Sequence, residues 1–116
     1  MRIAVASEGL KVSPVFGKCA SFTCYRIERG VIVECQNMPN PLFPPNRLAS
    51  LLHELDVRVL ITGTIEREAA EALRAVDIEV VPNRGGTARH AAEVYLARTL
   101  IGSDESDEEE LDVVEA

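Results

Sequence analysis

The segment that most limits the possible folds is an apolar run followed at once by a glycine, Arg58 to Glu66 (Arg-Val-Leu-Ile-Thr-Gly-Thr-Ile-Glu). Its three consecutive aliphatic residues, 59–61, are typical of a strand that is covered on both faces. Gly63 breaks the run just before a helical pattern begins. A strand, a tight turn and a helix start predict an α/β sheet, and ligands bind beyond the carboxyl ends of parallel strands in such sheets. The corner Thr62-Gly63-Thr64 is therefore the first candidate binding element.

The composition indicates one globular domain. The chain has 116 residues, of which 47% are hydrophobic and 27% charged. No apolar run is long enough to span a membrane, and Met1 to Ala6 lead directly into a strand pattern, so we expect no membrane partner. Cys19, Cys24 and Cys35 are too few for a disulfide framework, so we expect a cytoplasmic protein with reduced thiols.

The net charge of −7 is concentrated near the carboxyl end. Residues 102–116 carry eight acids and no Lys or Arg, which leaves 11 acids against 12 basic residues in residues 1–101. The body of the chain is close to neutral, which argues against a nucleic-acid partner. We expect a folded domain over residues 1–101 and an acidic, disordered tail over residues 102–116.

Hydrophobic periodicity predicts five strands and three helices. The predicted strands cover residues 2–6, 21–27, 31–35, 59–61 and 78–81, and the predicted helices begin at the capping residues Asn46, Thr64 and Thr87. Residues 37–46 contain four prolines and are predicted to form an unpaired surface loop. The element order strand, hairpin, helix, strand, helix, strand, helix follows.

This order predicts one mixed sheet. Right-handed crossovers make the first, fourth and fifth strands parallel, and the hairpin continues from the free edge of the first strand. The predicted spatial order is third, second, first, fourth, fifth, with the second strand antiparallel, as in ribonuclease H-like folds. Loops 7–18, 62–65 and 82–87 then meet at one edge of the sheet and form a crevice.

Two registers are possible for the hairpin around Gly30. A two-residue turn would place Cys24 opposite Cys35, as a redox pair would require. A three-residue loop instead places Cys24 opposite Glu34 and collects the apolar residues of both strands on one face. Because a buried face fixes register, we expect the second arrangement, with the two cysteines on opposite faces.

The loops supply the candidate ligands. Cys19 ends the long first loop, where a thiolate would suit iron-sulfur ligation and an ordinary buried thiol is the alternative. His90 lies in the first turn of the third predicted helix. The segment Arg84-Gly85-Gly86-Thr87, followed by Arg89, forms either an anion site or a turn with a helix cap. No carboxylate cluster or nucleophile with a nearby base is evident, so we expect no enzymatic activity.

Several segments resemble the dinitrogenase iron-molybdenum cofactor biosynthesis family, which includes NifX-like and NafY-like proteins and the carboxyl-terminal part of NifB-like proteins. The segments, within residues 1 to about 101, are Met-Arg-Ile-Ala-Val-Ala (1–6), Lys-Val-Ser-Pro-Val-Phe-Gly-Lys (11–18), Cys-Tyr-Arg-Ile-Glu-Arg-Gly (24–30), Leu-Ile-Thr-Gly-Thr-Ile (60–65) and Gly-Thr-Ala-Arg-His-Ala-Ala-Glu-Val-Tyr-Leu (86–96). Val15 stands where many relatives have histidine.

The resemblance implies a ribonuclease H-like domain that carries an iron-sulfur or iron-molybdenum type cluster, or its precursor, with cofactor-assembly proteins as possible partners. The expected metal ligands are Cys19 and His90. The other expected cofactor-binding residues are Ser13, Pro14, Phe16, Gly17, Thr62, Gly63, Thr64, Arg84, Gly85, Gly86 and Thr87. The alternative is a protein-interaction module that uses the acidic tail or the proline-rich loop and binds no metal.

Overall fold

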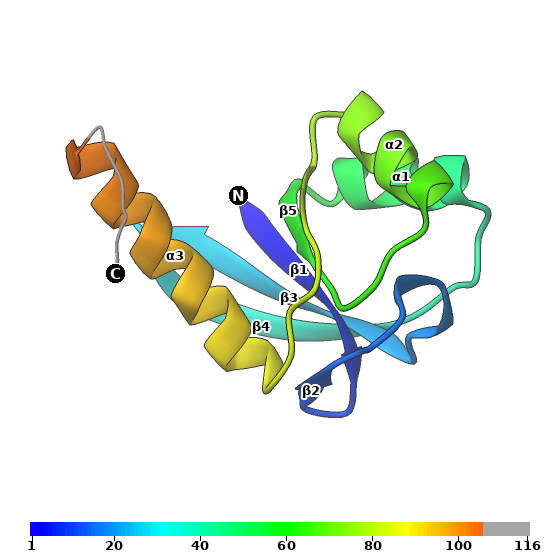
Figure 1. Ribbon diagram of the computed structural model, residues 1–116, viewed down its shortest axis with the longest axis horizontal. Helices are drawn as coiled ribbons and strands as arrows, with labels where there is room; N and C mark the ends of the chain where they lie inside the picture. Colours follow the sequence, from blue (N-terminus) through cyan, green and yellow to red (C-terminus); the bar gives the residue numbers. More distant parts are fainter. Residues whose placement is uncertain (106–116) are drawn as a thin grey trace.

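The computed structural model describes residues 1–105 and shows three layers, with helices on both sides of a central sheet (Figure 1). The strands are β1 (Arg2–Glu8), β2 (Lys11–Val12), β3 (Ser21–Glu28), β4 (Val31–Pro39), β5 (Val57–Ile61) and β6 (Glu79–Val81). The helices are α1 (Pro45–Glu54), α2 (Arg67–Ala75) and α3 (Ala88–Glu105), with a short 3-10 turn, η1, at Phe16–Lys18. None of the helices within this described part is long and apolar enough to cross a membrane.

The sheet confirms the predicted mixed α/β architecture and differs in detail. Its order is β4-β3-β1-β5-β6, in which β1, β5 and β6 are parallel and β3 is antiparallel to both of its neighbours. The five predicted strands are therefore neighbours as expected. The predicted count is wrong, because β2 pairs with β1 inside the segment expected to be a loop. A strand of two residues carries no periodic pattern that a sequence could reveal.

The alternation of side chains along the central strand builds two cores. Ala4 and Ala6 of β1 face α1 and α2, and small side chains there let the two helices approach the sheet. Ile3 and Val5 point the other way and pack with α3. Both faces of β1 and β5 are covered, which explains the unbroken apolar run from which the fold was predicted.

The predicted hairpin register is wrong, although the two cysteines do face opposite sides. The turn has two residues, Arg29 and Gly30, with φ values of 55° and 77°, which suits a tight hairpin. A bulge in β4 then shifts the pairing, so that Cys35 lies opposite Tyr25. Cys24 is buried beneath α1 and α2, whereas Cys35 is exposed. Because the bulge shifts the register, a two-residue turn is compatible with Cys24 and Cys35 on opposite faces of the sheet.

The proline-rich segment is more ordered than predicted. Strand β4 continues to Pro39, which pairs with Ser21 at the edge of the sheet, where a missing N–H group is tolerated. Helix α1 begins at Pro45 with Pro44 as its N-cap, so the prediction of Asn46 as the cap is wrong. Proline is favoured in the first turn because its fixed φ suits the helix and its N–H would have no partner there.

The caps of the other two helices give opposite outcomes. The prediction of Thr64 is wrong, because Glu66 is the N-cap residue of α2 and the Thr64 hydroxyl donates to the carbonyl of Pro14 instead. The prediction of Thr87 is confirmed, because its hydroxyl accepts a hydrogen bond from the amide of His90 at 3.1 Å. Helix α3 extends to Glu105, beyond the predicted domain end at residue 101. The rest of the predicted acidic tail lies outside the described residues.

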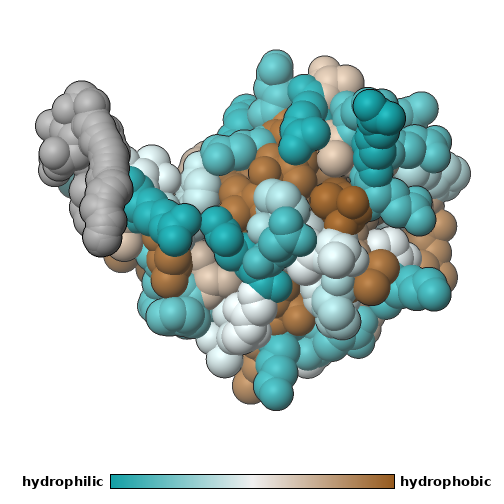
Figure 2. All heavy atoms as spheres, viewed as in Figure 1, coloured by the Kyte–Doolittle hydropathy of each residue, from teal (hydrophilic) through white to brown (hydrophobic). Residues whose placement is uncertain are grey.

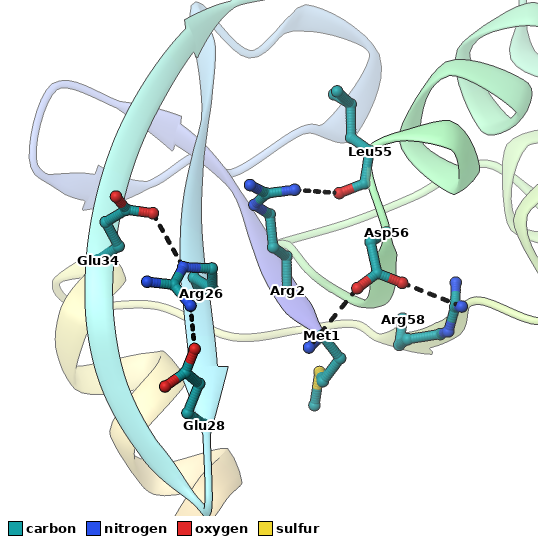
Figure 3. A network of polar contacts seen from close by, with 8 residues as sticks. All are labelled: Met1, Arg2, Arg26, Glu28, Glu34, Leu55, Asp56 and Arg58. Atoms are coloured by element: carbon teal, nitrogen blue, oxygen red, sulfur yellow. Dashed lines mark hydrogen bonds and ion pairs between the residues drawn. The ribbon is translucent and has the colours of Figure 1, made fainter.

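Charged groups tie strands together at the end of the sheet opposite the three loops (Figure 3). The Arg2 guanidinium donates to the carbonyl of Leu55 at 2.7 Å. Asp56 lies 3.0 Å from Arg58 and 3.6 Å from the N-terminal amino group. A separate exposed cluster surrounds Arg26 on β3 and β4. These contacts join the start of β1 to β5, so this end of the sheet has a structural role.

Candidate functional site

The loops that follow β1, β5 and β6 meet as predicted, and backbone hydrogen bonds join them. The amide of Gly63 donates to the carbonyl of Ser13 at 3.0 Å, and the amide of Thr64 donates to the carbonyl of Pro14 at 2.7 Å. In return, the amide of Phe16 donates to the carbonyl of Thr64 at 2.9 Å. The Ser13-to-Phe16 segment is therefore held as a short ribbon against the corner that follows β5.

Gly63 makes this close approach possible. A Cβ atom at this position would lie 2.5 Å from the carbonyl oxygen of Pro14 and 2.6 Å from that of Ser13. Real Cβ atoms do not come so near to backbone oxygen, so every other residue would push the two segments apart. The structure thus shows Gly63 at a close approach of two backbone segments.

The third loop joins the same corner from the other side. The amide of Arg84 donates to the carbonyl of Thr62 at 2.9 Å, and that of Asn83 donates to the carbonyl of Gly63 at 2.8 Å. The carbonyl of Gly86 accepts from the amide of Val12 at 2.9 Å. Backbone contacts therefore close the single crevice that was expected between the three loops. The space for a ligand lies beside these contacts.

A hollow of about 590 Å³ opens on the side of the sheet that α1 and α2 cover. Its walls come from η1, the proline-rich segment and the start of α2. The lining residues are Val15, Phe16, Gly17, Lys18, Asn40, Leu42, Phe43, Pro45, Leu48, Thr64, Ile65, Glu66 and Ala69. Figure 2 shows hydrophobic residues exposed among the hydrophilic ones on one face of the molecule. We refer to this space as the η1 hollow.

The η1 hollow is mainly apolar, with a few polar groups on its walls. Phe16 is 4% exposed, and the centre of its ring lies 5.7 Å from that of Phe22, which anchors η1 to the core. Lys18 contributes a positive charge and Glu66 a negative one. The guanidinium of Arg47 lies 4.2 Å from the centre of the Phe43 ring and adds a second cation beside one wall. This combination suits a guest with an apolar or polarisable surface and a negative charge.

Cys19 lies next to η1 but inside the core, only 3% exposed. Burial, with a smaller contribution from the charge of Glu8, raises the pKa of its thiol to about 11. The side-chain amide of Asn40 donates to the Cys19 carbonyl at 2.9 Å and lies 3.5 Å from the sulfur. The thiol is therefore protonated near neutral pH, and a metal would have to displace its proton to bind.

The two predicted metal ligands do not come together. Cys19 belongs to the core between the sheet and α1 and α2, whereas His90 is exposed on α3, which covers the opposite face. Among the residues that the structure describes, no three His, Cys, Asp or Glu side chains are grouped in a way that could hold a metal ion. The topology places both residues near the same edge of the sheet, but the sheet itself separates them.

The remaining predicted residues divide between the two faces. Phe16, Gly17 and Thr64 line the η1 hollow, and Ser13, Pro14 and Gly63 fix the backbone behind it. Arg84 lines a different hollow, beside α3. Thr62 is fully buried, and its hydroxyl has no hydrogen-bond partner in the described part of the chain. Gly85 and Gly86 shape the turn that leads to the Thr87 cap.

Sequence reasoning predicted only three of the residues that line the η1 hollow, and those it missed include Lys18, Asn40, Phe43 and Glu66. A signal existed for Asn40 and Phe43, because both lie in the proline-rich segment that was expected to be a surface loop. Nothing in the sequence indicated that this segment would fold back over η1. That contact depends on Asn40, whose amide bonds to Cys19, a residue 21 positions earlier.

Comparisons with known proteins agree with this architecture. The sequence profile of the family described as "Dinitrogenase iron-molybdenum cofactor" matches residues 1–98. The crystal structure of a protein designated PH0822 is 23% identical, with a TM-score of 0.76, and the match covers 84% of this chain and 92% of that one. A comparison with curated proteins gave no significant match.

Two further solved structures resemble the chain at somewhat higher identity. The apo form of the orange protein from Desulfovibrio gigas is 28% identical, with a TM-score of 0.69 and coverage of 84% of this chain and 88% of that one. A candidate NifB protein from Thermotoga is 25% identical, with a TM-score of 0.65 and coverage of 81% and 85%. Both matches extend over most of each chain.

Proposed function

The chain belongs to the dinitrogenase iron-molybdenum cofactor family, and from this premise we propose that it carries an iron-sulfur or iron-molybdenum type cluster, or its precursor, in the η1 hollow. The cluster is cargo that the protein receives and passes on, and the protein performs no reaction of its own. Cofactor-assembly proteins are the proposed donors and acceptors of the cargo. The proposed location is the cytoplasm, and the strand order supports a ribonuclease H-like relationship as part of the same proposal.

The observation that carries the proposal is the chemistry of the η1 hollow. Its volume of about 590 Å³ is within the range of small-molecule sites. None of its lining residues is Cys or His, so these walls fit a finished cluster held by shape, charge and hydrogen bonds rather than one attached to protein thiolates. The ammonium of Lys18 is the donor that would face an anionic guest, because the side-chain amide of Asn40 already donates to Cys19.

In the described part of the chain no Ser, Cys or His lines the hollow, and the Thr64 hydroxyl already donates to the carbonyl of Pro14. This lining supports the proposal of a carrier rather than an enzyme. The predicted residues behind the hollow have a positioning role in this proposal. Ser13, Pro14 and Gly63 hold η1 in place, while Phe16, Gly17 and Thr64 form the wall. Cys19 and His90 do not act as a pair.

Retention of metal by matched charge variants tests the proposal. The wild-type chain, Lys18→Glu and Lys11→Glu are incubated without oxygen with ferrous iron and sulfide, or with iron-molybdenum cofactor extracted from dinitrogenase. After desalting, metal per chain and visible absorbance are measured. Lys11 is exposed on β2 and does not line the hollow, so it controls for the change in net charge.

We expect Lys18→Glu to retain the cluster about tenfold more weakly, because reversing one charge beside an anion costs about 1.4 kcal/mol or more. Lys11→Glu should match the wild type. Carriage in the η1 hollow is rejected if wild-type protein retains no cluster from either source, or if Lys18→Glu retains as much as Lys11→Glu.

A further inference from the structure

A second hollow, of about 380 Å³, lies between the edge strand β6 and helix α3. Its lining residues are Glu79, Val81, Arg84, Val94, Tyr95, Arg98 and Thr99. It shares no lining residue with the η1 hollow, and α3 covers the opposite face of the sheet from α1 and α2 (Figure 1). We refer to it as the α3 hollow.

The acidic group in the α3 hollow already has a partner. The Tyr95 hydroxyl donates to a carboxylate oxygen of Glu79 at 2.7 Å. Burial, together with this hydrogen bond, raises the pKa of Tyr95 to about 12, so the phenol keeps its proton and continues to donate. Thr99 donates its own hydroxyl proton to the carbonyl of Tyr95 at 2.9 Å. Within residues 1–105, Arg84 and Arg98 are then the lining side-chain donors that have no assigned acceptor.

Arg84 and Arg98 form no ion pair with any carboxylate in the described part of the chain. The sequence suggested Arg89 as the second cation of an anion site near Arg84. The structure instead pairs Arg89 with Glu93 at 3.1 Å on α3. The second cation near Arg84 is Arg98, which lines the same hollow although the two residues are far apart in the sequence.

From this arrangement we infer that the α3 hollow binds the oxyanion of a small molecule, a phosphate or a carboxylate, between the guanidinium groups of Arg84 and Arg98. Guanidinium groups present paired N–H donors that match two oxygens of such an anion. Val81 and Val94 provide an apolar wall for a short carbon chain attached to the anion. Glu79 faces the same space and limits the bound anion to the arginine side.

The experiment is a titration of the full chain with inorganic phosphate and, separately, with succinate, followed through backbone amide NMR shifts at constant ionic strength. The test variant is Arg84→Gln with Arg98→Gln. The control is Arg29→Gln with Arg74→Gln, which removes the same charge at two arginines outside the hollow. Saturating shifts at Val81, Arg84 and Thr99 are expected in the wild type and the control. The anion that saturates at lower concentration identifies the ligand class.

In the test variant the apparent dissociation constant should rise at least about tenfold, because both charge-assisted contacts are lost. The inference is overturned if neither anion gives saturating shifts at the α3 hollow, or if the test variant binds as tightly as the control. It is also overturned if the shifts cluster around Lys18 instead. Cluster carriage in the η1 hollow is measured separately, so either result stands without the other.

Discussion

At the scale of single residues, Gly63 is the point on which the binding edge depends. Its amide and carbonyl both take part in joining the three loops, through Ser13 on one side and Asn83 on the other. The absence of a side chain allows the carbonyl oxygens of Pro14 and Ser13 to lie 2.5 and 2.6 Å from the position that a Cβ atom would take. A single position thus fixes the backbone on which η1 is held.

Replacing Gly63 with alanine should lower the free energy of unfolding by about 2 kcal/mol, because the added methyl group would overlap two backbone oxygens that cannot move independently. Urea denaturation followed by circular dichroism measures this change. Gly85→Ala is the control, since a Cβ there meets nothing within 4 Å. Equal stability of the two variants would show that the approach at Gly63 is not tight.

At this scale, predictions that depended on backbone geometry were correct. Predictions that depended on where a side chain is buried were wrong. Gly63 was recognised because a glycine between a strand and a helix has few other roles. Cys19 and His90 were placed near one edge correctly, but the sequence does not tell on which face of the sheet a loop residue ends. The Thr62 hydroxyl, which has no hydrogen-bond partner among residues 1–105, was also unforeseeable, since its pairing depends on which atoms surround it.

At the scale of elements, helix α3 is fixed by its first turn. The hydroxyl of Thr87 accepts from the amide of His90, and the amide of Ala88 donates to the carbonyl of Leu10. Gly86, with φ of 76°, turns the chain into this position. The start of α3 is thus bound to the β1–β2 connection, which orients the helix over its face of the sheet.

Thr87→Ala should lower the free energy of unfolding by about 1 kcal/mol, because the first turn would lose its capping acceptor. Thr99→Ala is the matched control. The Thr99 hydroxyl donates to a carbonyl of its own helix and caps no helix end, so its loss should change stability by less than about 0.5 kcal/mol. Thermal and urea unfolding of both variants give the comparison. A Thr87→Ala chain as stable as Thr99→Ala would remove the capping role.

Periodicity predicted most elements because the buried faces are regular. It failed at β2, which has two residues, and at the extension of β4 to Pro39, where an edge position tolerates proline. The bulge in β4 was also missed, because it leaves no mark on composition. The Thr64 prediction failed because a hydroxyl near a helix start can bond elsewhere, and here it bonds to Pro14.

At the scale of the whole molecule, the sheet divides the predicted site. The three loops lie at one edge of the sheet, as the topology predicted. Their backbones are hydrogen-bonded directly to one another, so no space for a ligand remains between them. The hollows lie to either side, one beside α1 and α2 and the other beside α3. Which side a lining residue occupies depends on the packing of loops, and a strand order alone cannot give that information.

Stability should fall in alkaline solution because buried thiols and phenols hold their protons in the folded state. Burial raises the pKa of Cys19 from 9.0 to about 11 and that of Tyr95 from 10.0 to about 12. Above pH 9 the unfolded chain loses these protons first, so it binds fewer protons than the folded chain. The free energy of unfolding should be fully retained below pH 9 and decline between pH 9 and 12.

Urea denaturation at pH 8, 10 and 11 measures this decline. Tyr95→Phe removes one of the raised groups and should lose less stability between pH 10 and 11 than the wild-type chain does. A stability that rises across this interval, or an identical decline in the variant, would contradict the assignment to Tyr95.

The location of bound iron tests the central claim most directly. Crystals of the cluster-loaded chain, grown without oxygen, would give an anomalous difference map at the iron absorption edge. The account predicts one peak in the η1 hollow, bordered by Phe16, Lys18 and Ile65, with no protein thiolate attached. A peak bonded to Cys19, one beside His90 on α3, or loaded crystals with no peak in the η1 hollow would contradict it.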